Sequence, residues 1–155
     1  MRKLILILMT TFSLHGYAAQ TLTDLDSEVT KFIATGNWTV VSAINKLVVF
    51  LNNKSVISGP TAKAWLLYNY LPESDTNRKV LSYKSYEHFQ CAVRKSATAK
   101  AVLYSGQYGG GEILKTDNLE QTGLSFAVVV LDSISEDALE MVCNYGKKAS
   151  PPQGR

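Results

Sequence analysis

Four glycines in the segment YSGQYGGGE (residues 104–112) form the stretch of this chain most suggestive of a ligand-binding loop. A phosphate-binding loop follows the pattern Gly-x-x-x-x-Gly-Lys-Ser/Thr and lies between a strand and a helix. Here Glu112 follows the last glycine and would repel a phosphate, and no helical periodicity comes after it. A dinucleotide-binding loop also requires a strand followed by a helix. The segment is therefore predicted to be a turn or a β-bulge, in which glycine permits positive φ angles.

His88 is the residue best suited to act as a general base, a role that requires a nearby nucleophile and an acid that orients the imidazole. On a strand its neighbour Glu87 points to the opposite face, so we expect His88 to be an ordinary exposed strand residue. Glu136 and Glu140 share one helical face, opposite the apolar stripe, which predicts a solvated helix surface. We therefore predict no catalytic residue and no enzymatic activity.

Cys91 and Cys143 are the two cysteines of the chain. An even number of cysteines in an exported protein favours a disulfide, which at this sequence separation would stabilise the fold by roughly 4 kcal/mol. The alternative is a pair of free, buried thiols. Two distant cysteines and His88 do not supply the four ligands of a zinc site, so neither a metal nor another cofactor is expected.

Basic and aromatic side chains are mixed in the stretch from residue 78 to residue 86. Such mixtures favour protein recognition. The candidate partner-binding residues are Arg78, Lys79, Tyr83, Lys84 and Tyr86. On a strand, Tyr83 would point to one face of a sheet, and Lys84 and Tyr86 to the other. The alternative is a solvated sheet face whose charges prevent edge-to-edge aggregation.

The N-terminus has the three-part pattern of a secretory signal peptide, predicted to span residues 1–18. Arg2 and Lys3 precede an apolar run, and small residues at positions 16 and 18 precede the expected cleavage site. A membrane anchor is the alternative, but the run is shorter than the ~20 residues that span a bilayer. No cysteine follows the run, so we expect an exported protein, periplasmic, surface-located or secreted, that is not a lipoprotein and has no membrane span.

Cleavage would change the charge balance of the chain. The formal net charge of +3 includes Arg2 and Lys3, so the mature chain would carry +1. This near-neutral charge argues against nucleic-acid binding, which generally requires a marked basic excess.

The elements that would position these residues follow from the hydrophobic periodicity. A short helix is predicted within residues 19–36, ahead of a main domain at residues 37–148 and a flexible tail at 149–155. Strands are predicted at residues 37–44, 47–52, 61–71, 81–94, 96–105 and 125–131, and a long loop at residues 105–125. Ser133 and Glu136 form a capping box for a C-terminal helix that carries Cys143 and ends at Gly146. The predicted fold class is α+β, an antiparallel sheet of about six strands with this helix packed on it.

The ordered set of motifs resembles the surface-adhesin protein E family of Gram-negative bacteria. The matching features are Trp38 and Val40 followed by VVFLNNKSV, AKAWLLYNY, YKSYEHFQC, YSGQYGGGE and DSISEDALEMVC, from about residue 38 to residue 148. The resemblance implies an antiparallel sheet joined to a C-terminal helix by a disulfide at positions matching Cys91 and Cys143. The family's lipidation cysteine is absent here, and the N-terminal helix is additional.

The resemblance also implies a function. It implies a non-enzymatic protein that binds host matrix proteins such as vitronectin or laminin, with Arg78, Lys79 and Lys84 in places similar to a basic, aromatic stretch of the family. The alternative is a periplasmic structural or envelope-associated protein without a host ligand, and a hydrolase is the third and weakest hypothesis. An exposed edge strand could pair two copies of the chain as a homodimer.

Overall fold

The structure is a computed structural model. It describes residues 27–44, 47–71 and 79–147. The predicted signal peptide, the first part of the N-terminal helical segment, Arg78 and the predicted tail lie outside these ranges.

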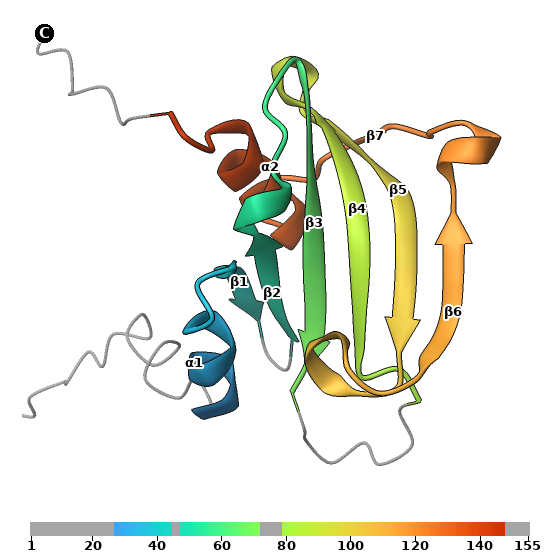
Figure 1. Ribbon diagram of the computed structural model, residues 1–155. Helices are drawn as coiled ribbons and strands as arrows, with labels where there is room; N and C mark the ends of the chain where they lie inside the picture. Colours follow the sequence, from blue (N-terminus) through green and yellow to red (C-terminus); the bar gives the residue numbers. More distant parts are fainter. Residues whose placement is uncertain (1–26, 45–46, 72–78, 148–155) are drawn as a thin grey trace, which may run out of the picture.

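The described residues form two α-helices, seven strands and four short 3-10 turns (Figure 1). In chain order they are α1 (Ser27–Ile33), β1 (Trp38–Ile44), β2 (Leu47–Asn52), η1 (Asn53–Ser55), β3 (Thr61–Tyr70), β4 (Ser82–Gln90), η2 (Cys91–Val93), β5 (Lys95–Tyr104), η3 (Gln107–Gly109), β6 (Ile113–Asn118), η4 (Glu120–Thr122), β7 (Ala127–Val128) and α2 (Ile134–Cys143). The expected α+β class, with an antiparallel sheet, a C-terminal helix and a short N-terminal helix, is confirmed.

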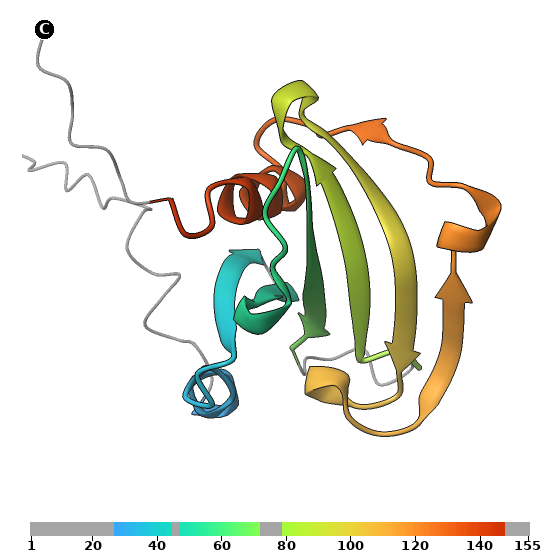
Figure 2. The ribbon, with the colours of Figure 1, turned by 45° about the horizontal axis from the view of Figure 1, so that its top comes forward.

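The sheet is a meander. Strands β1 to β6 pair in chain order, each antiparallel to the next, and β7 pairs with the beginning of β5. Figure 2 shows the strong twist of this sheet, with β1 at one edge and β6 at the other. The topology requires only short connections between neighbouring strands, as is usual for antiparallel sheets.

Strand β3 lies at the centre and is covered on both faces, as its apolar residues at both odd and even positions predict. Leu66 packs with Val49 and Phe89 against Ala138 and Leu139 of α2. We call this side of the sheet the helix face.

The side of the sheet opposite the helix face has a smaller hydrophobic core of its own. Leu67 and Phe50 pack there against Val29 of α1, and all three side chains are fully buried. Because each face of the sheet has a hydrophobic core, β3 carries apolar residues on both faces instead of alternating apolar and polar ones.

A disulfide joins α2 to the end of β4. Cys91 begins η2, directly after β4, and Cys143 is the last residue of α2, with their Cα atoms 5.8 Å apart. The predicted disulfide is confirmed, and the described residues contain no free cysteine.

The strand predicted at residues 81–94 ends at Gln90, because Cys91–Val93 form η2 and Arg94 has a left-handed φ of 50°. Two further predicted boundaries are wrong. Residues 105–125 are not one loop, because β6 forms within them and pairs with β5. Of the strand predicted at residues 125–131 only the two residues of β7 pair with the sheet. In both cases the pattern of apolar residues does not follow burial. Strand β6 is an edge strand with mostly exposed side chains, so it shows no apolar alternation. Val130 and Leu131 are apolar, but they are 70% and 66% exposed.

Candidate binding surface

The glycine-rich segment forms a tight turn, as predicted, and two fully buried polar side chains attach it to the sheet. Asn69 Oδ1 accepts a hydrogen bond of 2.6 Å from the backbone N–H of Tyr108. The Ser82 hydroxyl donates to the carbonyl of Gly106 at 2.6 Å and accepts from the N–H of Gly109 at 2.9 Å. The backbone groups of this turn are therefore used to bind the sheet, and the turn closes one end of the side opposite the helix face.

The structure separates the predicted partner-binding residues. Lys84 and Tyr86 point away from the helix face, because their partners across β3 are Leu67 and Trp65. Tyr83 lies on the helix face, and Lys79 is exposed just before β4. Arg78 lies outside the described residues.

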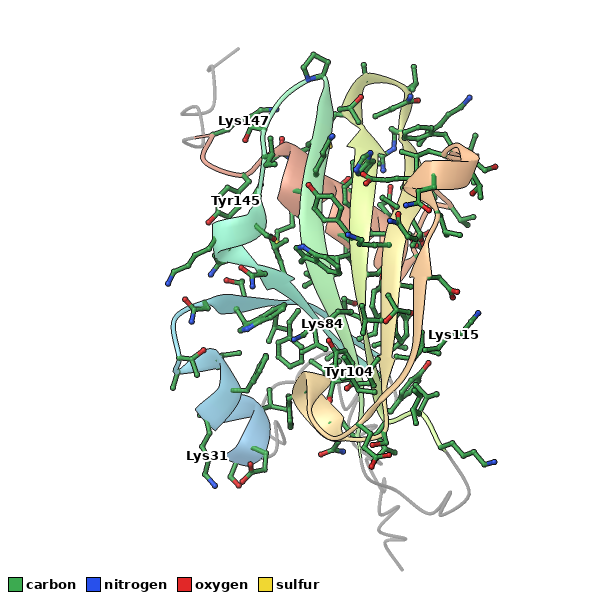
Figure 3. The ribbon with its side chains drawn as sticks, turned by 45° about the vertical axis from the view of Figure 1, so that its right-hand side comes forward. Lys31, Lys84, Tyr104, Lys115, Tyr145 and Lys147 are labelled. Carbon is green, nitrogen blue, oxygen red and sulfur yellow. A yellow bond between two sulfur atoms is a disulfide. The ribbon has the colours of Figure 1, made fainter. Side chains whose placement is uncertain are left out.

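Aromatic rings and lysines gather on the side of the sheet around Lys84. The Trp65 and Tyr86 ring centroids are 5.2 Å apart, and Lys84 Nζ lies 5.3 Å from the ring centroid of Tyr104, a cation–π distance. Figure 3 shows Lys84 and Tyr104 next to each other over the sheet, near the η3 turn. A shallow hollow of about 300 Å³ runs between them, with Trp38 and Trp65 in its lining.

Two further lysines complete this surface. Lys63 and Lys100 are the strand partners of His88 and Tyr86, so they project from the same side as Lys84. We define the aromatic–lysine face as Lys63, Trp65, Lys84, Tyr86, Lys100 and Tyr104. Trp65 and Tyr104 were not among the candidates predicted from the sequence. They pair with Tyr86 and Ser82 of β4, so the strand register, which the sequence does not give, is needed to place them on this face.

The lysines of this face have no anionic partner. Among the residues that the structure describes, no carboxylate lies within ion-pair distance of Lys63, Lys84 or Lys100. Arg94, in contrast, is paired with Glu136 and lies 3.6 Å from Glu140, so these two glutamates are not simply a solvated helix surface. The aromatic–lysine face therefore presents uncompensated positive charge.

The expectation that His88 is exposed is wrong. The residue is only 5% exposed, and its ring stands edge-on to Tyr86 with centroids 5.3 Å apart. Burial is the main cause that lowers the His88 pKa, the charge of Lys63 adds to it, and Glu120 opposes both. Glu120 Oε1 lies 3.4 Å from His88 Nε2.

His88 is not joined by groups that would make it a catalytic base. Glu87 lies on the helix face, as expected from the strand alternation, and no hydroxyl or thiol is hydrogen-bonded to the imidazole in the described part of the chain. In the same ranges no three His, Cys, Asp or Glu side chains gather as a metal site would require.

The arrangement defines a class of protein. It is a small α+β domain in which a meander sheet is joined by a disulfide to its last helix, with aromatic rings and lysines on the side opposite that helix. The model of the surface-adhesin protein E family matches residues 38–144, and the chain belongs to this family.

The chain is similar to solved structures of one protein. The structure of Haemophilus influenzae protein E matches with a TM-score of 0.51 and 16% sequence identity, covering 74% of this chain and 89% of that chain. Crystal form II of the same protein matches with a TM-score of 0.47 and 14% identity, over 69% and 94% of the two chains. At these identities the likeness concerns the fold alone.

The remaining comparisons add little. No curated protein shows significant sequence similarity to the chain. None of the helices in the described ranges is long and apolar enough to cross a bilayer.

Proposed function

We propose that the protein is an exported, non-enzymatic binding module of the adhesin type that contacts a protein partner through the aromatic–lysine face. Membership of the surface-adhesin protein E family supports this role. The observation that carries the proposal is the set of three lysines without anionic partners around the Trp65–Tyr86 pair.

The chemistry of the face indicates what it would bind. Aromatic rings supply apolar contact area at a low cost in conformational entropy, and unpaired lysines attract carboxylates of a partner. We therefore expect an acidic segment of a host matrix protein, with vitronectin and laminin as the first candidates. Lys79 and Tyr83 are not part of this face and would serve a different contact.

The test compares two triple variants on immobilised vitronectin and laminin. Changing Lys63, Lys84 and Lys100 to Gln removes the positive charge of the face and keeps polar side chains that are only one atom shorter. We expect binding to be about ten- to a hundredfold weaker, since each exposed pair contributes roughly 0.5–1 kcal/mol. Binding should also weaken as salt concentration rises.

The matched control changes three lysines outside the face to Gln. Lys31, Lys115 and Lys147 lie on α1, on β6 and after α2 (Figure 3). This variant has the same net charge as the first and should bind like the wild type. If the two variants lost the same amount of binding affinity, the effect would come from overall charge, and the assignment to this face would be wrong.

We also propose that two copies of the chain pair through β6. This strand forms one edge of the sheet, and Ile113 and Leu114 on it are 63% and 44% exposed. Light scattering during size-exclusion chromatography should give the mass of a dimer, and Ile113→Lys should give that of a monomer. A wild-type monomer at high concentration contradicts this part of the proposal.

A further inference from the structure

The helix face has a cavity that the proposed function does not use. It has a volume of about 430 Å³ and lies between β3, β4 and β5 on one side and the chain from residue 125 to residue 138 on the other. Ser125, Ala127 and Ser135 are exposed and line its mouth, so solvent reaches the interior.

A carboxylate lies inside this cavity without a cationic partner. Glu87 lines the cavity and is only 9% exposed. The hydroxyls of Ser85 and Thr98 both donate hydrogen bonds to Oε1, the second at 2.8 Å. Within the described ranges no Lys, Arg or His lies at ion-pair distance from Glu87, and no side chain or backbone N–H donates to Oε2.

Such an arrangement is costly unless a cation completes it. Glu87 is nine-tenths buried and so keeps only part of its hydration, while both hydroxyl donors serve Oε1 and leave Oε2 open toward the cavity. The free oxygen therefore marks a place where a positively charged hydrogen-bond donor would be stabilised.

Stacked tyrosines form the wall next to Glu87. The Tyr68 and Tyr83 rings are nearly parallel, with an interplanar angle of 5° and centroids 4.4 Å apart. Burial raises the pKa of both phenols, and the charge of Glu87 adds to this, so both hydroxyls stay neutral donors and acceptors. Aromatic faces beside a carboxylate are a favourable surrounding for an ammonium group.

An apolar hollow borders the cavity. A second space of about 540 Å³ shares Tyr83 and Ala101 with the first and is lined further by Tyr70, Leu103 and Lys79. A ligand with its positive group at Glu87 would thus have an apolar surface nearby for the remainder of its chain.

We propose that this cavity binds a primary ammonium group carried on an unbranched alkyl chain. The ammonium donates to Glu87 Oε2 and to the hydroxyls around it, and the methylene groups lie along Tyr83 toward Leu103. A free aliphatic diamine and the lysine side chain of a partner peptide share this chemistry.

The experiment measures binding by NMR titration and calorimetry with three probes. The probes are 1,5-diaminopentane, Nα-acetyl-lysine-N-methylamide and the uncharged 1,5-pentanediol. We expect saturable binding of at least one ammonium probe, with shifts at residues 85–87 and 98, and none of the diol. Binding of the diamine alone would identify a free aliphatic amine as the ligand. Binding of the lysine derivative alone would identify the lysine side chain of a partner peptide as the ligand.

Two variants and a control test the site. Glu87→Gln keeps an acceptor for Ser85 and Thr98 but removes the charge, and should weaken binding about ten- to a hundredfold. Glu112→Gln changes an exposed glutamate elsewhere and should have no effect. Ala127→Phe fills the mouth at an exposed position and should also weaken binding, which keeps the proposal testable if Glu87→Gln folds poorly.

Several results would overturn the proposal. They are an absence of saturable binding of both ammonium probes, equal binding of the diol, or binding that neither Glu87→Gln nor Ala127→Phe reduces. None of these measurements depends on the aromatic–lysine face. A negative result would therefore refute the amine site and leave the proposed function unaffected.

Discussion

His88 makes the stability of the protein depend on pH. Its pKa is lowered from the ordinary value of 6.5, chiefly by burial and then by Lys63, against the opposing charge of Glu120. Between the lowered pKa and 6.5 the unfolded chain therefore binds more protons than the folded chain. The contribution of His88 to stability is complete above 6.5 and decreases as the pH falls through 6.5 toward the folded pKa.

This prediction is tested by urea unfolding of the wild type and of His88→Gln at about pH 7.5 and about pH 5. The wild type should lose more unfolding free energy on acidification than the variant does. Other groups titrate in both proteins, so the difference between them isolates His88. Equal losses would mean that the imidazole is not buried as the structure shows.

At the same scale, the contrast between Lys84 and Arg94 shows what sequence could and could not predict. Lys84 was predicted as a binding residue, and in the structure it is half-buried on a face rich in aromatic rings. Arg94 lies ten residues after Lys84 and pairs with Glu136, 42 residues later. Pairing over such a separation follows from the fold and leaves no local signal.

Among the elements, the glycine turn carries a prediction about backbone geometry. Gly111 has φ +73°, and a Cβ there would lie 2.7 Å from the backbone N of Gly106. Gly36 has nearly the same φ, +74°, with no atom within 4 Å of its Cβ position. Both Gly→Ala variants force a residue with a Cβ into the left-handed region, which is unfavourable. Only Gly111→Ala adds a clash between the new Cβ and the backbone.

We expect Gly36→Ala to lower the unfolding free energy by about 1 kcal/mol and Gly111→Ala by about 2–3 kcal/mol. Thermal or urea unfolding of the two variants provides the comparison. Equal effects would contradict the close backbone packing of the turn. Because Tyr108 of this turn packs against Phe32 of α1 with ring centroids 4.9 Å apart, Gly111→Ala should also weaken the packing of α1.

The disulfide between β4 and α2 is expected to stabilise the fold. Replacing Cys91 and Cys143 together by Ala should lower the unfolding free energy by about 4 kcal/mol, because the bond closes a loop with a sequence separation of 52 residues. Denaturation of the double variant beside the wild type measures this. A loss below about 1 kcal/mol would show that the contacts of α2 hold the helix without the covalent bond.

Elements with strong periodicity or caps were predictable, and exposed edges were not. The C-terminal helix was predicted from its apolar stripe and capping box, and Ser133 Oγ indeed accepts from the N–H of Glu136. The Glu136 side chain reaches Asp132 N–H at 2.7 Å, one residue before the position expected for the reciprocal bond. Strand β6 was missed because its pairing with β5, and not burial, determines its conformation.

For the whole molecule, export is the first matter to test. The predicted signal peptide lies outside the described residues, so its evidence is the sequence alone. We expect the mature chain to lack residues 1–18 and to be absent from the cytoplasmic fraction of the cells that make it. Mass spectrometry of the purified protein and cell fractionation check the two expectations.

The location outside the cytoplasm separates the two functional hypotheses. Exposure at the surface or in the medium is required for contact with host proteins. Protein confined to the periplasm would contradict the adhesin role and favour the structural alternative, and an intact leader would contradict export itself.

The central claim is that the aromatic–lysine face is the surface that meets a protein partner. The most direct measurement is the acetylation rate of each lysine, followed by mass spectrometry, with and without bound vitronectin or laminin. We expect Lys63, Lys84 and Lys100 to be protected in the complex, while Lys31, Lys115 and Lys147 react as in the free protein. Protection of the second group with unchanged rates in the first would contradict it.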